Sequence, residues 1–186
     1  MDRTWSTTVA CIVSSLAVSS PTIALPAQNE GFVFSGDQAV SATDKRQFIR
    51  VWEKLSVSQL KKRFPSYSVS AIESDCGGTC TLIEGEGSTY IRIDYGGDRK
   101  WSFYRIYSDA LSSRDTSGNV IGTSLRKAVG ANTTKCDRGE DTTCESVLIK
   151  GLSYIVGGCP FEAESIPACA KVAGFEISAT QVGPRH

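Results

Sequence analysis

Apolar residues recur at helical spacing in the stretch that precedes Pro65. Residues 43–55 are therefore predicted to form a helix, with Thr43 or Asp44 as its cap. The apolar positions of this helix are Phe48, Val51, Trp52 and Leu55.

Two further helices are predicted from their end signals. In "SVSQLKKRF" the residues Ser56 and Gln59 form a capping box, and Pro65 ends the helix. In "IGTSLRKAVG", residues 121–130, a short helix is closed by Gly130, because glycine adopts the left-handed conformation that ends many helices.

After Pro65 the pattern changes to a period of two, which is typical of strands. Alternating or β-branched runs separated by glycine-rich turns predict an antiparallel sheet. The predicted strands are residues 67–72, 80–85, 89–97, 101–108, 144–151, 152–158 and 171–179. Together the pattern predicts an α+β fold with helices packed on an antiparallel sheet.

An internal repeat organises these elements. "SQLKKRF" resembles "TSLRKAV", and "GSTYI" resembles "GLSYI". Leu60 and Leu125 are 65 positions apart, while Cys80 and Cys144 are 64 apart. A tandem duplication of two similar halves, about residues 55–107 and 120–178, is therefore predicted.

The N-terminus has the order of a secretory signal peptide: a charged start, a short apolar run and small residues. Cleavage is predicted after Ala24 or Ala27, so residues 1–27 form the leader. Residues 28–42 are predicted to be a flexible segment, and 43–182 a single domain. The protein is expected in the periplasm or secreted, with no transmembrane segment in the mature chain. Lipidation at Cys11 is the alternative interpretation of the leader.

Removing the leader leaves six of the seven cysteines, an even number that is typical of disulfides in an exported chain. Because neighbours close small loops most readily, the predicted pairs are Cys76–Cys80, Cys136–Cys144 and Cys159–Cys169. Zinc and thioredoxin-like chemistry are the alternatives for "CGGTC". Its spacing is not Cys-x-x-Cys, and the chain's one histidine is His186.

Charge and motifs argue against several classes of function. With 20 basic and 20 acidic residues, the chain shows no overall footprint for nucleic acid or an anionic membrane, and Lys61–Arg63 is interpreted as a solvated helix face. Ser58-x-x-Lys61 and Ser124-x-x-Lys127 match one motif of penicillin-binding proteins, but the accompanying motifs are missing. The protein is therefore predicted to be no enzyme and to hold no metal or cofactor.

The acids Glu84, Glu86, Asp94 and Asp98 flank turns and are interpreted as solvated.

A binding surface is predicted where the two halves differ. The aromatic-rich stretch 94–107 has no counterpart in the second half, and it mixes the residue types that are enriched at binding hot spots. Its candidate residues are Tyr95, Arg99, Trp101, Tyr104 and Arg105. The alternative is a hairpin whose aromatic side chains fill the core. A second candidate is the loop 114–119, where Asp115 or Ser117 would reach a partner, the alternative being a polar turn.

The stretch "RIYSDALSSRDTSGNVIGTSLRKAVGANTTKC...CESVLIKGLSYIVGG" resembles the RpoE-regulated lipoprotein family of Gram-negative envelopes, whose biochemical role is unassigned. The resemblance covers roughly Leu55 to Ser178, and it places Cys136 and Cys144 on the family's cysteine pair. It implies a periplasmic, non-catalytic protein. The predicted function is a binding or envelope-maintenance module, with another envelope protein as its expected partner. The alternative is a secreted inhibitor of a hydrolase of the lysozyme or β-lactamase type.

Overall fold

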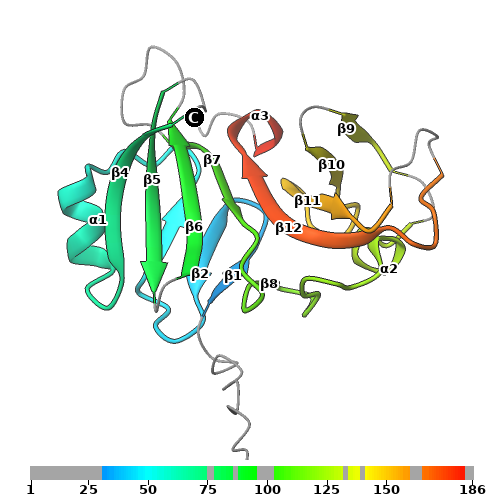
Figure 1. Ribbon diagram of the computed structural model, residues 1–186, viewed down its shortest axis with the longest axis horizontal. Coiled ribbons are helices and arrows are strands. Elements are labelled where there is room, and N and C mark those ends of the chain that lie inside the picture. The colour runs from blue at the N-terminus through cyan, green and yellow to red at the C-terminus, as the bar shows by residue number, and fades with distance from the viewer. Residues whose placement is uncertain are drawn as a thin grey trace, which may run out of the picture.

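The chain folds mainly into β-strands (Figure 1). The structure is a computed structural model, and it describes residues 31–74, 78–85, 88–95, 103–131, 134–138, 141–159 and 165–182. These residues form two sheets and three short helices: α1 Val57–Arg63, α2 Leu125–Val129 and α3 Ala179–Val182. The predicted α+β class, with helices packed on a sheet, is therefore wrong.

The larger sheet has eight antiparallel strands in the order β4-β5-β6-β7-β12-β11-β10-β9. Their bounds are Ser68–Ser74, Gly78–Gly85, Ser88–Tyr95, Phe103–Ser108, Lys171–Ser178, Leu152–Gly157, Thr142–Glu145 and Cys136–Arg138. The strands β7 and β12 meet in the middle of the sheet, where Ile106 lies opposite Ile177. This central pair joins the two halves of the chain into one sheet.

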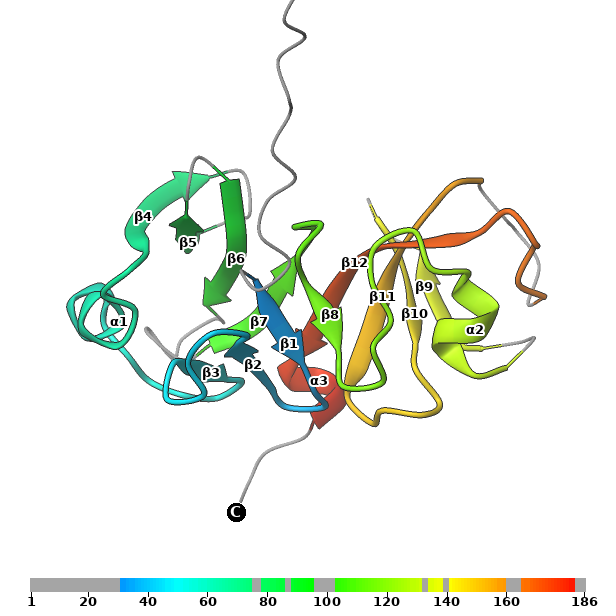
Figure 2. The same ribbon diagram turned by 90° about the horizontal axis from the view of Figure 1, so that it is seen from below.

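The smaller sheet has four strands in the order β3-β2-β1-β8. Their bounds are Phe48–Arg50, Gln38–Ser41, Phe32–Phe34 and Arg114–Asp115. Figures 1 and 2 show β1 and β2 on the side of the molecule opposite β5 and β6. Buried side chains from both sheets, among them Phe32 and Ile93, form one hydrophobic core.

Residues 43–55 do not form the predicted helix. They contain β3 and the turns on either side of it, and Gln47, Ile49 and Val51 are the buried positions. This alternation has a period of two, and residues 48–50 pair with β2 as the edge strand of the smaller sheet. Asp44 holds a turn, because its carboxylate accepts a hydrogen bond from the backbone N–H of Arg46.

The segment 28–42 also differs from the prediction of a flexible segment. Its described part carries β1 and β2, and the side chains of Phe32 and Phe34 are fully buried. Two phenylalanines separated by one residue place both rings on the same face of a strand, which anchors this segment in the core.

The end signals of the other two predicted helices are confirmed. The Ser56 side chain accepts a hydrogen bond from the Gln59 backbone, and the Gln59 side chain accepts one from the Ser56 backbone. Gly130 ends α2 with φ 81°. Most predicted strands are found as well, although the strand predicted over 144–151 ends at Glu145, after which the chain turns.

Two predicted disulfides are confirmed, Cys136–Cys144 and Cys159–Cys169. Cys80 is disulfide-bonded as well. Its predicted partner, Cys76, lies outside the described residues, so that pairing stays a prediction. Among the residues that the structure describes, none of the helices has the length and apolar character needed to span a bilayer.

The topology bears on the internal repeat. Each half begins with a helix, α1 or α2, and continues with four antiparallel strands. In each half the last strand, β7 or β12, lies at the centre of the sheet and the first strand, β4 or β9, lies at its edge. The cysteine pairs break this symmetry, because Cys144 lies opposite Cys136 whereas Cys80 lies opposite Ile72. The duplication stays a prediction, and this order is the one that a duplication would produce.

Candidate functional site

A row of polar side chains crosses the middle of the eight-stranded sheet. The cross-strand registers align Glu145 with Ser153, Ser153 with Glu176, Glu176 with Tyr107, and Tyr107 with Arg92. We call these five residues the polar row. Because side chains alternate between the faces of a sheet, their neighbours Tyr154, Phe175, Ile106 and Ile93 face the core.

Glu176 on β12 is the most buried acid of the polar row, with 8% of its surface exposed. The Arg105 Nε lies 3.7 Å from its Oε1. Burial raises the pKa of Glu176, while Arg105 lowers it less strongly; the nearby charges of Asp94, Asp141 and Asp137 raise it further. The site therefore holds a desolvated carboxyl group, and its partner Arg105 lies too far away to form a short ion pair.

Arg92 on β6 is held more tightly. Its Nε donates to the Asp94 Oδ1 at 3.0 Å, and its guanidinium lies over the Tyr107 ring, 5.1 Å from the centroid. Burial raises the pKa of Tyr107, and Arg92 partly opposes this. The two contacts fix the Arg92 side chain, so Arg105 is the more available guanidinium of the two.

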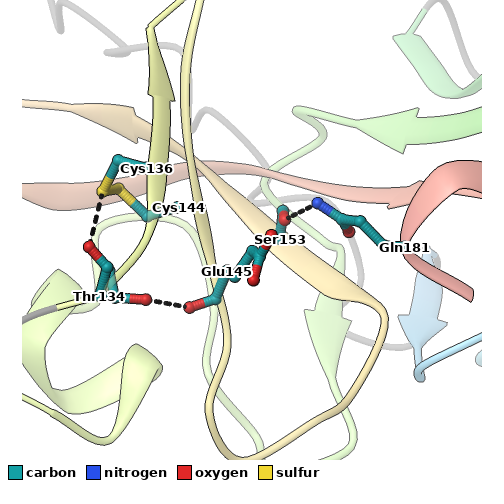
Figure 3. Close-up of a disulfide and its surroundings, with 6 residues drawn as sticks. All are labelled: Thr134, Cys136, Cys144, Glu145, Ser153 and Gln181. Atoms are coloured by element: carbon teal, nitrogen blue, oxygen red, sulfur yellow. Dashed lines mark hydrogen bonds between the residues drawn. A yellow bond between two sulfur atoms is a disulfide. The ribbon is translucent and has the colours of Figure 1, made fainter.

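The helix α3 contributes a polar group to the same face (Figure 3). The Gln181 Nε2 lies 2.8 Å from the Ser153 Oγ and donates a hydrogen bond to it. The Gln181 Oε1 is buried and has no hydrogen-bond partner among the described residues. Figure 3 also shows the Thr134 hydroxyl donating to the Glu145 carbonyl beside the Cys136–Cys144 disulfide. These contacts fix the β10 end of the polar row.

Of the predicted binding residues in the stretch 94–107, the structure describes Tyr95, Tyr104 and Arg105. Arg105 has 45% of its side chain exposed. The Tyr95 and Thr81 hydroxyl oxygens lie 2.6 Å apart, and both Tyr95 and Tyr104 pack against the core. The core-filling alternative thus describes these two tyrosines better than an open surface does. Arg99 and Trp101 lie outside the described residues.

The loop 114–119 differs from the prediction at Asp115, which is only 1% exposed. Its carboxylate accepts hydrogen bonds from the backbone N–H groups of Ser117 and Asn119, from the Asn119 side chain and from the Tyr154 hydroxyl. Burial raises the pKa of Tyr154, which keeps that hydroxyl protonated as a donor. Asp115 therefore holds the loop and cannot reach a partner, whereas Ser117 is exposed.

Sequence reasoning missed Glu176, Ser153 and Gln181. Glu176 lies within the predicted strand 171–179, and its residue type alone indicates no function. Because side chains alternate along a strand, Phe175 and Ile177 place Glu176 on the face away from the core, and the local pattern predicts an exposed acid. The alignment with Ser153 and Tyr107 depends on strand order and could not be read from the sequence.

The described residues contain no cluster of three or more metal-ligating side chains. What the polar row and Arg105 supply is a set of hydrogen-bonding groups: an exposed guanidinium, a buried carboxyl group and an aromatic ring. Arginine and tyrosine are both enriched at protein–protein contacts.

Comparisons with known proteins show the fold alone. No protein-family model matches the chain, and no curated protein matches its sequence. The chain is similar in structure to the uncharacterized protein YfeY from Escherichia coli, with a TM-score of 0.51 and 14% identity. The alignment covers 81% of this chain and 97% of YfeY.

The confirmed disulfides indicate an extracytoplasmic protein, because such bonds persist in oxidising compartments.

Proposed function

We propose that this protein is a non-catalytic module of a bacterial cell envelope and that it binds a protein partner through Arg105 and the adjacent polar row. The observation that carries the proposal is the pairing of an exposed guanidinium with a buried carboxyl group on β7 and β12. A partner that covered Arg105 would exclude water from this ion pair, and it would also contact the half-buried Tyr107.

The location at the centre of the sheet supports this proposal. β7 and β12 are the two innermost strands, so their backbones are hydrogen-bonded on both sides. A binding surface on such strands is rigid, which lowers the entropy lost on association. The fold shared with a bacterial protein is compatible with an envelope role.

The test is capture from a periplasmic extract with the immobilised protein, followed by identification and titration of the captured partner. Arg105→Ala is the variant and Lys127→Ala the matched control, since Lys127 is an exposed cation on α2 in the other half. We expect Arg105→Ala to weaken binding at least about tenfold, as expected for a hot-spot arginine. Equal binding by both variants would reject this face.

A second function, inhibition of a hydrolase, is favoured by the loop 114–119. The buried Asp115 holds this loop in one conformation and leaves Thr116, Ser117 and Gly118 exposed. A rigid exposed loop is suited to enter an enzyme cleft. Lysozyme and β-lactamase assays with purified protein test this function, and undiminished hydrolysis at saturating concentrations would exclude it for these two enzymes.

A further inference from the structure

The neutral charge of the whole chain conceals a strongly basic segment. Residues 44–63 contain seven basic residues and two acidic ones, Asp44 and Glu53. The rest of the chain then has 13 basic and 18 acidic residues, so a local charge of +5 is balanced by −5 elsewhere. The seven basic residues are Lys45, Arg46, Arg50, Lys54, Lys61, Lys62 and Arg63. We call this set the basic face.

The fold brings the two parts of the basic face together. The Arg63 Nη1 on α1 donates to the Phe48 carbonyl on β3 at 2.9 Å and to the Glu53 Oε1 at 2.7 Å. The Phe48 ring also has the guanidinium groups of Arg50 and Arg63 within 4.8 and 4.9 Å of its centroid. α1 is thereby fixed against β3. Figure 1 places α1 at the end of the molecule away from α2, and Figure 2 shows β3 on the same side as α1.

The acids of this segment leave most of its positive charge unbalanced. Asp44 pairs with Arg46 at 2.9 Å, and Glu53 pairs with Arg63 at 2.7 Å. Among the described residues, no acidic side chain forms an ion pair with the four lysines of the basic face. All four lysines are exposed: Lys45, Lys54, Lys61 and Lys62.

The helix itself accounts for only part of this charge. Lys61, Lys62 and Arg63 occupy the last turn of α1, where cations are favoured by the negative end of the helix dipole. Lys45 and Lys54 lie outside the helix, on the loop before β3 and the chain after it, so this effect does not explain them.

We propose that the basic face docks the protein on an anionic phospholipid surface. Lysine-rich composition favours a lipid surface over a protein partner, because lysine is depleted at protein interfaces and enriched where chains contact anionic headgroups. A surface of many phosphates can meet charges that are spread over a helix and two loops without a shaped pocket.

The test measures co-sedimentation of the purified protein with vesicles. Vesicles of phosphatidylglycerol and phosphatidylethanolamine are compared with vesicles of phosphatidylcholine alone, at ~0.05 M and ~0.5 M salt. We expect binding only to the anionic vesicles and only at low salt. Absence of binding to the anionic vesicles at low salt would overturn the proposal. The same result would be seen if the basic face bound an acidic protein and no lipid.

A charge-reversal pair locates the contact. Lys61→Glu with Lys62→Glu removes two lysines of the basic face. Lys127→Glu with Lys171→Glu makes the same change in net charge at two exposed lysines in the other half. We expect the first pair to weaken vesicle binding at least about tenfold and the control pair about twofold or less.

Equal losses in the two pairs would show that only net charge matters and would reject a specific face. Thermal melting checks that both pairs are folded. If the helix variant does not fold, Lys45→Glu with Lys54→Glu replaces it, because these two lysines lie outside α1. Retained binding in that variant would also reject the proposal.

Discussion

At the scale of single residues, Glu176 has the clearest electrostatic consequence. Burial disfavours its ionised form and raises its pKa, and Arg105 compensates only in part. A carboxyl group whose pKa is higher in the folded state binds more protons there than in the unfolded chain. Its contribution to stability is therefore fully present below the ordinary glutamate pKa of 4.5 and is lost as the pH rises through the raised value.

Glu176→Gln should remove this loss, because glutamine is neutral at every pH. We expect the variant to melt at a higher temperature than the wild type at pH 7, and the difference to disappear near pH 4. Thermal melting across this range checks the prediction. Glu145→Gln is the matched control in the same polar row, since Glu145 is 41% exposed and its pair with Lys135 should contribute little. A lower melting temperature for Glu176→Gln at pH 7 would contradict the argument.

Asp115 shows why a residue type alone did not identify the binding surface. An acid in a polar loop with Ser117 and Gly118 is compatible with a contact loop, although this composition favours a polar turn. Only the approach of the Tyr154 hydroxyl, 39 positions away, shows that the carboxylate faces inward. Arg105, by contrast, is exposed on β7, and its role in binding stays a prediction. Its pairing with Glu176 depends on strand order and could not be read from the sequence.

At the scale of elements, local signals predicted some segments well and failed in others. The capping box at Ser56 and the left-handed Gly130 act within one turn of chain, so they are readable from sequence. The prediction of a helix over residues 43–55 was wrong, because the spacing of Phe48, Val51, Trp52 and Leu55 also fits a helical period. Ile49 and Gln47 complete a strand pattern instead, and pairing with β2 decides between the two.

The two confirmed disulfides should differ in their contribution to stability. Their loops are similar, with sequence separations of 8 and 10, so chain entropy predicts about 2–3 kcal/mol for each. Their surroundings differ, because Cys144 is fully buried in the core whereas Cys169 is exposed. Replacing the buried cysteine by serine also leaves a hydroxyl in apolar surroundings.

We therefore expect Cys136→Ser with Cys144→Ser to lower the free energy of unfolding more than Cys159→Ser with Cys169→Ser does. The expected losses are about 3–4 and about 2 kcal/mol. Urea titration of both double variants measures them under identical conditions. Equal midpoints and slopes would show that loop closure alone determines the effect and would contradict the predicted order.

At the scale of the whole molecule, the sheet order decides whether the two halves fold separately. β7 of the first half pairs with β12 of the second, and Phe34 of the smaller sheet stacks on Phe175 of the larger one at 5.4 Å. Neither half can expose these strands and rings without losing part of the shared core. The predicted boundary between halves is therefore not expected to separate two independently stable units.

Leu60 on α1 and Leu125 on α2 test this directly, since both are fully buried and occupy the positions that the repeat aligns. Alanine at either position should cost about 2–5 kcal/mol, as expected for truncating a buried leucine. Because one sheet joins the halves, each variant should show a single unfolding transition shifted to lower denaturant, with coincident signals from fluorescence and far-ultraviolet circular dichroism. Lys62→Ala and Lys127→Ala, on the exposed sides of the same helices, are the controls and should change stability by less than about 0.5 kcal/mol. Two separate transitions in either leucine variant would show that the halves unfold independently, and the β7–β12 pair would then contribute too little to couple them.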